Sequence, residues 1–213
     1  MTDSHDVEFN PLTLESIGKS VVYELMKRPV HPLPPEDRFR GSGVYAIYYS
    51  GTFPPYAGFQ DFNDKEEERF AWPLYVGKAV PKGSRKGETE FRAGTSRAIW
   101  NRLNQHSRSI DAAKNIELSD FRCRYLVVAP VWIRLAESLI TIEYRPLWNV
   151  LIDGFGNHDP GKGRYNQERS RWDELHPGRP WANRLQQPTS FAQGALIGEV
   201  KRFLAAPPPA ILP

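Results

Sequence analysis

The sequence predicts an α/β domain of the mixed α+β kind, in which helices flank a small central antiparallel sheet of three strands. Short β-prone segments occur at residues 43–51, 73–79 and 120–129. Helical patterns lie before, between and after them, and the order helix, strand, strand, helix, strand, helix is typical of a mixed domain. A chain of 213 residues is expected to form one such domain, with loop insertions and terminal extensions.

The core of this domain is expected between about residues 41 and 150. Residues 1–40 form an N-terminal extension, with a helix predicted over residues 12–28 because apolar side chains recur there at helical spacing. These side chains are Leu14, Ile17, Val21, Val22 and Leu25. Residues 151–213 form a C-terminal extension, with a last helix expected over residues 189–204.

Tyrosines mark the first two predicted strands. The stretch GVYAIYYSG is bounded by glycines and uncharged, and side chains alternate along a strand, so Tyr45 and Tyr49 share one face and Tyr48 lies on the other. The second strand, PLYVGKA, carries Tyr75. By pattern alone, these tyrosines serve either core packing or chemistry.

Two segments interrupt the predicted core. Residues 52–72 form a segment too long for a hairpin loop and are interpreted as an insertion. Residues 79–95 are rich in Gly, Lys and Arg, which predicts a mobile basic loop. Positive charge is concentrated in residues 78–124, which hold eleven basic and five acidic residues. Such clustering is typical of a surface that binds a polyanion, although a solvated basic surface has the same composition.

Composition excludes several classes of protein. The longest nearly apolar run, residues 125–133, is interrupted by Pro130 and is far too short to span a membrane. Residues 1–10 are acidic and lack the apolar region of a secretory signal, so a cytoplasmic protein with no membrane partner is expected. The single cysteine, Cys123, excludes an intrachain disulfide and a cysteine-based zinc site, and is expected to be a buried filler residue.

A helix is predicted over residues 96–113, with Thr95 or Ser96 as its N-cap. Its inward stripe consists of Ile99, Leu103, Ile110 and Ala113. His106 falls within this stripe and Arg102 on its flank, and the spacing of four residues points both the same way. An edge histidine and a snorkelling arginine would explain the pair without chemistry, and a phosphate-facing pair is the functional alternative.

The next helix is predicted over residues 130–144, with Pro130 in its first turn and Pro146 ending it. The side chains expected to face inward are Trp132, Leu135, Ala136, Leu139 and Ile140. Periodicity does not decide between Glu137, at the margin of this stripe, and Glu143, which is nearer to it. Either carboxylate is an ordinary exposed residue or a ligand for Mg²⁺.

These segments together resemble the GIY-YIG nuclease superfamily. The triplets GVY (Gly43–Tyr45) and YVG (Tyr75–Gly77) are similar to its two signature strands, with valine in place of isoleucine in both. An Arg-x-x-x-His helix, a third strand, a helix with a glutamate and an Asn soon after a Pro follow in the order of that superfamily. This resemblance covers roughly residues 41–150.

The flanking sequences VHPLPPEDRFRGSGVYA, YVGKAVP, YRPLWN and DGFGNHDPGKGR resemble the restriction-endonuclease branch of the superfamily. The relatives that this chain most resembles cut a six-base palindrome made only of G and C, which implies a CCGCGG-like site. A palindrome implies a two-fold homodimer on double-stranded DNA, and residues 52–72 and the N-terminal helix are the expected dimer surface. A restriction enzyme also implies a DNA methyltransferase that protects the host.

The resemblance implies six catalytic residues, namely Tyr45, Tyr75, Arg102, His106, Glu137 and Asn149. It selects Glu137 over Glu143 as the ligand of one Mg²⁺, with Mn²⁺ as a substitute. Tyr45 would take a proton from the attacking water, helped by His106 or a nearby charge, because a phenol with an ordinary pKa near 10 is a poor base at neutral pH.

The other three residues take supporting roles in the same scheme. Arg102 would clamp the scissile phosphate, Tyr75 would position water or phosphate, and Asn149 would orient the site by hydrogen bonding. The candidates for DNA contacts are Lys78, Lys82, Arg85, Lys86, Arg92 and Arg97. Each of these residues is also compatible with being only a solvated surface charge that contacts no DNA.

Other interpretations of the sequence remain at this point. The chain is also compatible with a non-specific or repair-type nuclease of the same superfamily, or with a DNA-binding module that has no activity. His158 is interpreted as a loop histidine in preference to a DNA contact. Its loop is not a Walker phosphate-binding motif, because its Gly-Lys pair is followed by glycine instead of Ser or Thr.

Overall fold

The structure is a computed structural model that describes residues 13–80 and 96–206. Its central sheet is antiparallel, with the strand order β1-β6-β2-β5. The strands are β1 (His31–Pro32), β2 (Gly43–Tyr49), β5 (Tyr75–Ala79) and β6 (Phe121–Val127). The sheet therefore has four strands where the sequence predicted three. The additional strand, β1, is a two-residue edge strand in a proline-rich segment, where proline costs no ladder hydrogen bond and no periodic pattern marks a strand.

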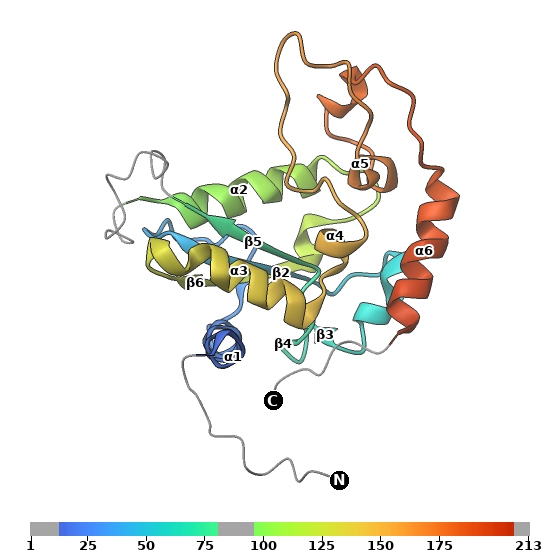
Figure 1. The fold of residues 1–213 in the computed structure, drawn as a ribbon. Coiled ribbons are helices and arrows are strands. Elements are labelled where there is room, and N and C mark those ends of the chain that lie inside the picture. Colours follow the sequence, from blue (N-terminus) through green and yellow to red (C-terminus); the bar gives the residue numbers. More distant parts are fainter. Residues whose placement is uncertain (1–12, 81–95, 207–213) are drawn as a thin grey trace, which may run out of the picture.

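Helices cover both faces of this sheet (Figure 1). Tyr48 on β2 donates a hydrogen bond to the sulfur of Met26 on α1 (Leu14–Met26), and α1 packs against α3 (Pro130–Tyr144). Tyr45, whose side chain points to the opposite face, contacts α2 (Ala98–Asp111). The predicted alternation of the tyrosines is thus confirmed, and it places α1 and α3 on one face and α2 on the other.

Two local predictions about these helices were wrong. Trp132 is 48% exposed, and the buried stripe of α3 runs instead through Ile133, Ala136, Ile140 and Tyr144. The helix is apolar on most sides, so its sequence does not fix which side faces the sheet. Ser96, the first residue of the predicted helix, does not cap α2. Arg97 holds the N-cap position without a side-chain hydrogen bond, and the Ile99 amide donates to the Gly41 carbonyl instead.

The predicted insertion is part of the core. Residues 52–72 contain the 3₁₀ helix η1 (Pro54–Phe59) and a small hairpin of β3 (Asn63–Asp64) and β4 (Arg69–Phe70). Its buried side chains are Tyr56, Phe59, Phe70 and Trp72. The buried Asn63 side chain donates to two backbone carbonyls and accepts from two backbone amides, which ties the hairpin to β2.

The C-terminal extension packs onto this insertion. It contains α5 (Arg171–Leu175), η4 (Ala182–Arg184) and α6 (Gln193–Ala205). The short helix α4 (Leu147–Val150) lies directly before the extension, and η3 (Leu118–Asp120) precedes β6. The helix α6 lies against η1, and both are drawn side by side in Figure 1. Within the described ranges, none of the helices is long and apolar enough to cross a membrane. Cys123 is a free, buried cysteine, as predicted.

A buried hydrogen-bond chain joins the insertion to α5. The Trp148 indole N–H donates to the Tyr56 hydroxyl (2.7 Å), which lies 2.6 Å from Nε2 of His176. The His176 Nδ1 lies 2.9 Å from the Asn115 side-chain oxygen, which can only accept, so Nδ1 carries the proton and Nε2 accepts from the Tyr56 hydroxyl. Both nitrogens of a neutral His176 are therefore satisfied inside the core.

This arrangement predicts acid sensitivity of the fold. Burial lowers the pKa of His176 from 6.5 to about 3. Between those values the unfolded chain binds a proton that the folded chain does not, so the free energy of unfolding falls as the pH drops below about 6.5, by up to ~1.4 kcal/mol per pH unit. We expect His176→Gln to lessen the slope in urea unfolding between pH 7 and 4.5 by this contribution, while the buried His106 keeps its own. Parallel curves for the two proteins would contradict the assignment.

Candidate active site

The candidate site is built around Tyr45, whose side chain is fully buried on β2. Its hydroxyl lies 2.7 Å from Nε2 of His106 on α2. Gly77 is opposite Tyr45 in the β2–β5 register, and a Cβ at this position would come within 2.3 Å of the phenol oxygen. The glycine of the YVG triplet is therefore required for the phenol to lie across β5 and reach the histidine.

Burial sets the protonation of this pair. Loss of solvation raises the pKa of Tyr45 well above its usual value of 10, and it lowers the pKa of His106 well below 6.5. The positive charge of Arg102 lowers the pKa of His106 further. At neutral pH the phenol keeps its proton and the imidazole is uncharged, so Nε2 is able to accept the Tyr45 hydroxyl.

Tyr75 and Arg102 lie beside this pair. The rings of Tyr45 and Tyr75 have centroids 6.3 Å apart, and the Tyr75 ring also meets the edge of His106. Burial raises the pKa of Tyr75, and the Arg102 guanidinium opposes that rise through its charge and a hydrogen bond. Two neighbouring strands and one helix thus bring together four residues predicted from the sequence.

Residues 154–158, which we term the support loop, close one side of the site. The Phe155 ring stacks on the His106 imidazole with centroids 4.4 Å apart and planes inclined by 17°. The Gly156 carbonyl accepts a hydrogen bond of 3.1 Å from Arg102, and the His158 imidazole contacts the same guanidinium. His158 is a loop residue, as predicted, but it also borders the site.

A buried ion pair holds the support loop in place. The side chains of Arg179 and Asp173 are 2% and 1% exposed, and they form two hydrogen bonds of 2.6 Å. The remaining donors of Arg179 bind the carbonyls of Gly154 (3.0 Å), Phe155 (3.1 Å) and Asn157 (3.2 Å). One guanidinium therefore fixes most of the loop backbone beneath His106 and Arg102.

Glu137 reaches the site from α3, on the other side of the edge strand β5. Its Oε2 forms an ion pair with Lys78, the residue that follows the YVG triplet. Its negative charge contributes to the raised pKa values of both Tyr45 and Tyr75, behind the larger effect of burial. The charge of the carboxylate therefore acts on both phenols of the site.

The chemistry of Glu137 suits a hard divalent cation. Its side chain is 22% exposed, and its Oε1 has no partner in the part of the chain that the structure describes. Over the same ranges, no three His, Cys, Asp or Glu residues gather into a metal cluster. A single carboxylate completed by water and phosphate oxygens is a usual environment for Mg²⁺, so the residues present fit that ion.

Asn149 acts on the backbone of β5. Its side chain accepts from the Val76 amide and donates to the Val76 carbonyl, both at 2.8 Å. It replaces a neighbouring strand at the free edge of the sheet and thereby fixes the residue next to Tyr75. This contact orients the backbone of β5 beside Tyr75. The role of Asn149 in the reaction stays a prediction.

The predicted DNA contacts are only partly described. Lys78 lies beside Glu137, and Arg97 is exposed at the start of α2. The other four, Lys82, Arg85, Lys86 and Arg92, fall outside the described residues.

Sequence reasoning missed the support of the site. Nothing in the local pattern separates Asp173 and Arg179 from solvated charges, because their burial depends on segments that are distant in sequence. In the run DGFGNHD, the aromatic Phe155 between two glycines was the available signal for a buried contact. The pairing of Lys78 with Glu137 joins residues 59 positions apart, which no spacing rule predicts.

Comparison with known proteins adds one finding. A family model described as the Eco29kI GIY-YIG domain matches residues 37–204, which include every residue of the site. A search of curated proteins found no match.

Proposed function

Because the chain belongs to the Eco29kI GIY-YIG family, a family of type II restriction endonucleases, we propose that it cleaves double-stranded DNA at a specific site in a Mg²⁺-dependent reaction. The observation that carries this proposal is the buried contact between Tyr45 and His106, bordered by Arg102 and faced by Glu137. Around this contact the proposal assigns His106 as the proton acceptor, Arg102 as the phosphate-binding cation and Glu137 as the metal-binding carboxylate.

The proton of the attacking water is assigned to Tyr45. Without bound DNA, the Tyr45 phenol is too weakly acidic to be ionised at neutral pH. It must therefore pass its own proton on as it accepts one from water. Nε2 of His106, 2.7 Å away, is placed to receive that proton. A bound phosphate offsets the positive charge of Arg102. This offset raises the pKa of His106 and favours the transfer.

Binding and positioning of the scissile phosphodiester are assigned to Arg102 and Tyr75. A guanidinium presents donors that match two phosphate oxygens, and the support loop fixes its position through Gly156. Glu137 would hold Mg²⁺ through its Oε1, the oxygen that is not paired with Lys78. When bound, the ion would supply positive charge that polarises the phosphate and stabilises the leaving 3′-oxygen.

The finer features of the proposal follow from the family. We infer a homodimer with one active site for each strand, a GC-rich palindrome such as CCGCGG as its site, and a methyltransferase that protects the host DNA. Residues 52–72 and α1 remain the proposed dimer surface, through their outward side chains, since the apolar side chains of the insertion are buried within the chain.

The test is cleavage of long unmethylated duplex DNA by the purified protein, with Mg²⁺ or with a chelator. Discrete fragments that need Mg²⁺ are expected, because a site-specific enzyme cuts at few positions. Glu137→Gln should abolish cleavage and keep DNA binding, since it removes the charge and retains the shape.

Glu143→Gln, on the same helix, is the matched control and should cleave normally. A smear of products would refute site specificity. Intact DNA that the folded protein nevertheless binds would refute the enzyme.

A further inference from the structure

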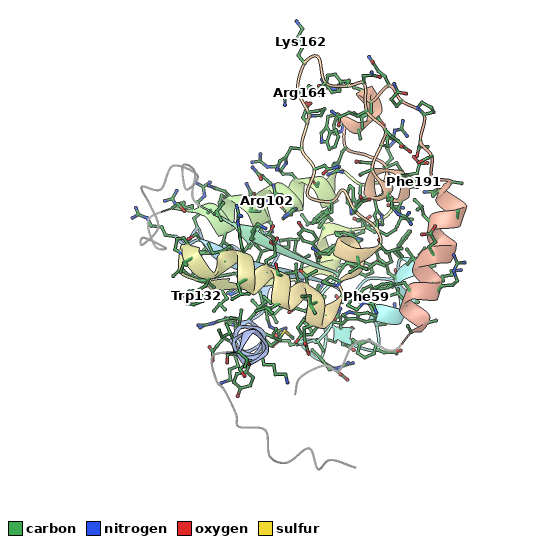
Figure 2. The ribbon with its side chains drawn as sticks, in the orientation of Figure 1. Phe59, Arg102, Trp132, Lys162, Arg164 and Phe191 are labelled. Carbon is green, nitrogen blue, oxygen red and sulfur yellow. The ribbon has the colours of Figure 1, made fainter. Side chains whose placement is uncertain are left out.

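A basic loop rises from the body of the molecule directly after the support loop. We term residues 159–165, Asp-Pro-Gly-Lys-Gly-Arg-Tyr, the tip loop. Figure 2 shows Lys162 and Arg164 at its outer end and Arg102 on α2 below them. Both cationic side chains are exposed, and within residues 13–80 and 96–206 neither forms an ion pair or a side-chain hydrogen bond.

The negative charge of the tip loop is neutralised from within. Its only carboxylate, Asp159, accepts from the Gly161 amide (2.9 Å), the Tyr165 hydroxyl (2.8 Å) and Arg184 (2.5 Å). The Arg184 guanidinium also lies over the Tyr165 ring, 4.6 Å from its centroid. Because Arg184 compensates Asp159, Lys162 and Arg164 leave two positive charges at the tip.

The shape of the tip loop is set by its own hydrogen bonds. The Arg164 amide donates to the Gly161 carbonyl, and the Gln186 amide donates to the Tyr165 carbonyl, which anchors the end of the loop. Gly161 and Gly163 have φ values of +83° and +87°, a region that favours glycine. A Cβ at either position would meet nothing within 4 Å, so open space surrounds the tip.

The base of the tip loop is continuous with the candidate active site. His158, the residue before Asp159, contacts Arg102, the residue assigned to the scissile phosphate. A partner bound at Arg102 that extends along the loop would therefore pass Lys162 and Arg164. Of the possible partners, a duplex with regularly spaced phosphates fits two exposed cations on a loop whose base contacts a third.

We propose that Lys162 and Arg164 bind backbone phosphates of the DNA duplex beside the scissile phosphate. This inference rests on the proposed function. Backbone contact is favoured over reading of base edges, because among the described residues no hydrogen bond orients either side chain. Base readout needs donors in fixed positions, whereas a phosphate accepts a cation from many directions.

The test compares the double variant Lys162→Ala/Arg164→Ala with the wild-type protein. DNA affinity is measured by fluorescence anisotropy without Mg²⁺, over a series of salt concentrations, on cognate and unrelated duplexes. Each lost phosphate contact lowers the magnitude of the negative slope of log K against log salt by about 0.9, so a decrease in magnitude of about 1.8 for each chain is expected. The decrease should be equal on both duplexes.

The matched control is Lys201→Ala/Arg202→Ala, which removes the same charge from exposed positions of α6, the helix packed against η1. Its slope should equal that of the wild-type protein. If the tip-loop double variant had the wild-type slope, the inference would be overturned. Cleavage by the wild-type protein would still support the proposed function in that case.

Weakening confined to the cognate duplex would also overturn the inference, in favour of base readout. Wild-type protein that neither binds nor cuts DNA would refute the proposed function itself, and the inference with it.

Discussion

Replacing Tyr45 with phenylalanine is expected to lower the turnover number for DNA cleavage by about 10²–10⁴-fold, the usual contribution of a general base. The substitution removes only the hydroxyl, which is the group 2.7 Å from Nε2 of His106. The ring still fills the space over Gly77, so the fold and the affinity for DNA should be retained. Single-turnover rates with saturating enzyme measure the loss directly.

Tyr48→Phe is the control for this experiment. Tyr48 is also fully buried on β2, but its hydroxyl faces α1 and donates only to the sulfur of Met26. Its loss should change the turnover number by less than about twofold, since that hydroxyl lies on the face of the sheet away from α2. Full turnover by the Tyr45 variant would refute the assignment of the base, and equal losses in both variants would point to a general effect on packing.

Replacing Arg179 with methionine is expected to reduce the free energy of unfolding by about 3–5 kcal/mol, the usual cost of removing one partner of a buried ion pair. The Asp173 carboxylate would remain buried without its partner, and three carbonyls of the support loop would lose their donor. Urea unfolding at pH 7 measures this change.

Cleavage should also decrease under conditions in which the Arg179 variant remains folded. The support loop carries Phe155 beneath His106 and the Gly156 carbonyl that holds Arg102, so a looser loop leaves both side chains less well placed. The expected signature is a lower turnover number with little change in the affinity for non-cognate DNA.

Arg171→Met provides the comparison for stability. Arg171 pairs with Glu199, and the two side chains are 19% and 34% exposed. Water screens a pair at this depth, so its loss should cost no more than about 1 kcal/mol. If the Arg179 variant were no less stable than the Arg171 variant, the support loop would not depend on the buried guanidinium.

Local sequence was sufficient to predict the main elements of the core. The pattern of residues 130–144 predicted α3 with its observed bounds, because Pro130 fits only the first turn and Pro146 prevents a further one. The strand GVYAIYY was predicted from its β-prone residues, and its alternation correctly placed Tyr45 and Tyr48 on opposite faces.

Local sequence was insufficient where the outcome depends on distant partners. The side of α3 that faces the sheet depends on packing against α1, which the local pattern does not contain. The pattern therefore assigned Trp132 to the inward side, whereas the side chain is exposed. The strand β1 exists only because β6 offers an unpaired edge to His31 and Pro32. The N-terminus of α2 is satisfied by Gly41 instead of by its own cap.

The candidate site divides in the same way. The sequence by itself determined the residue types and their spacing: Tyr45 and Gly77 in neighbouring strands, Arg102 and His106 one turn apart, and a glutamate on the next helix. Only the tertiary structure decided that Lys78 pairs with Glu137 and that Arg179 holds the loop beneath His106. The physical reason is that backbone geometry fixes the direction of side chains a few residues apart. Burial and ion pairing are decided only when segments distant in sequence pack together.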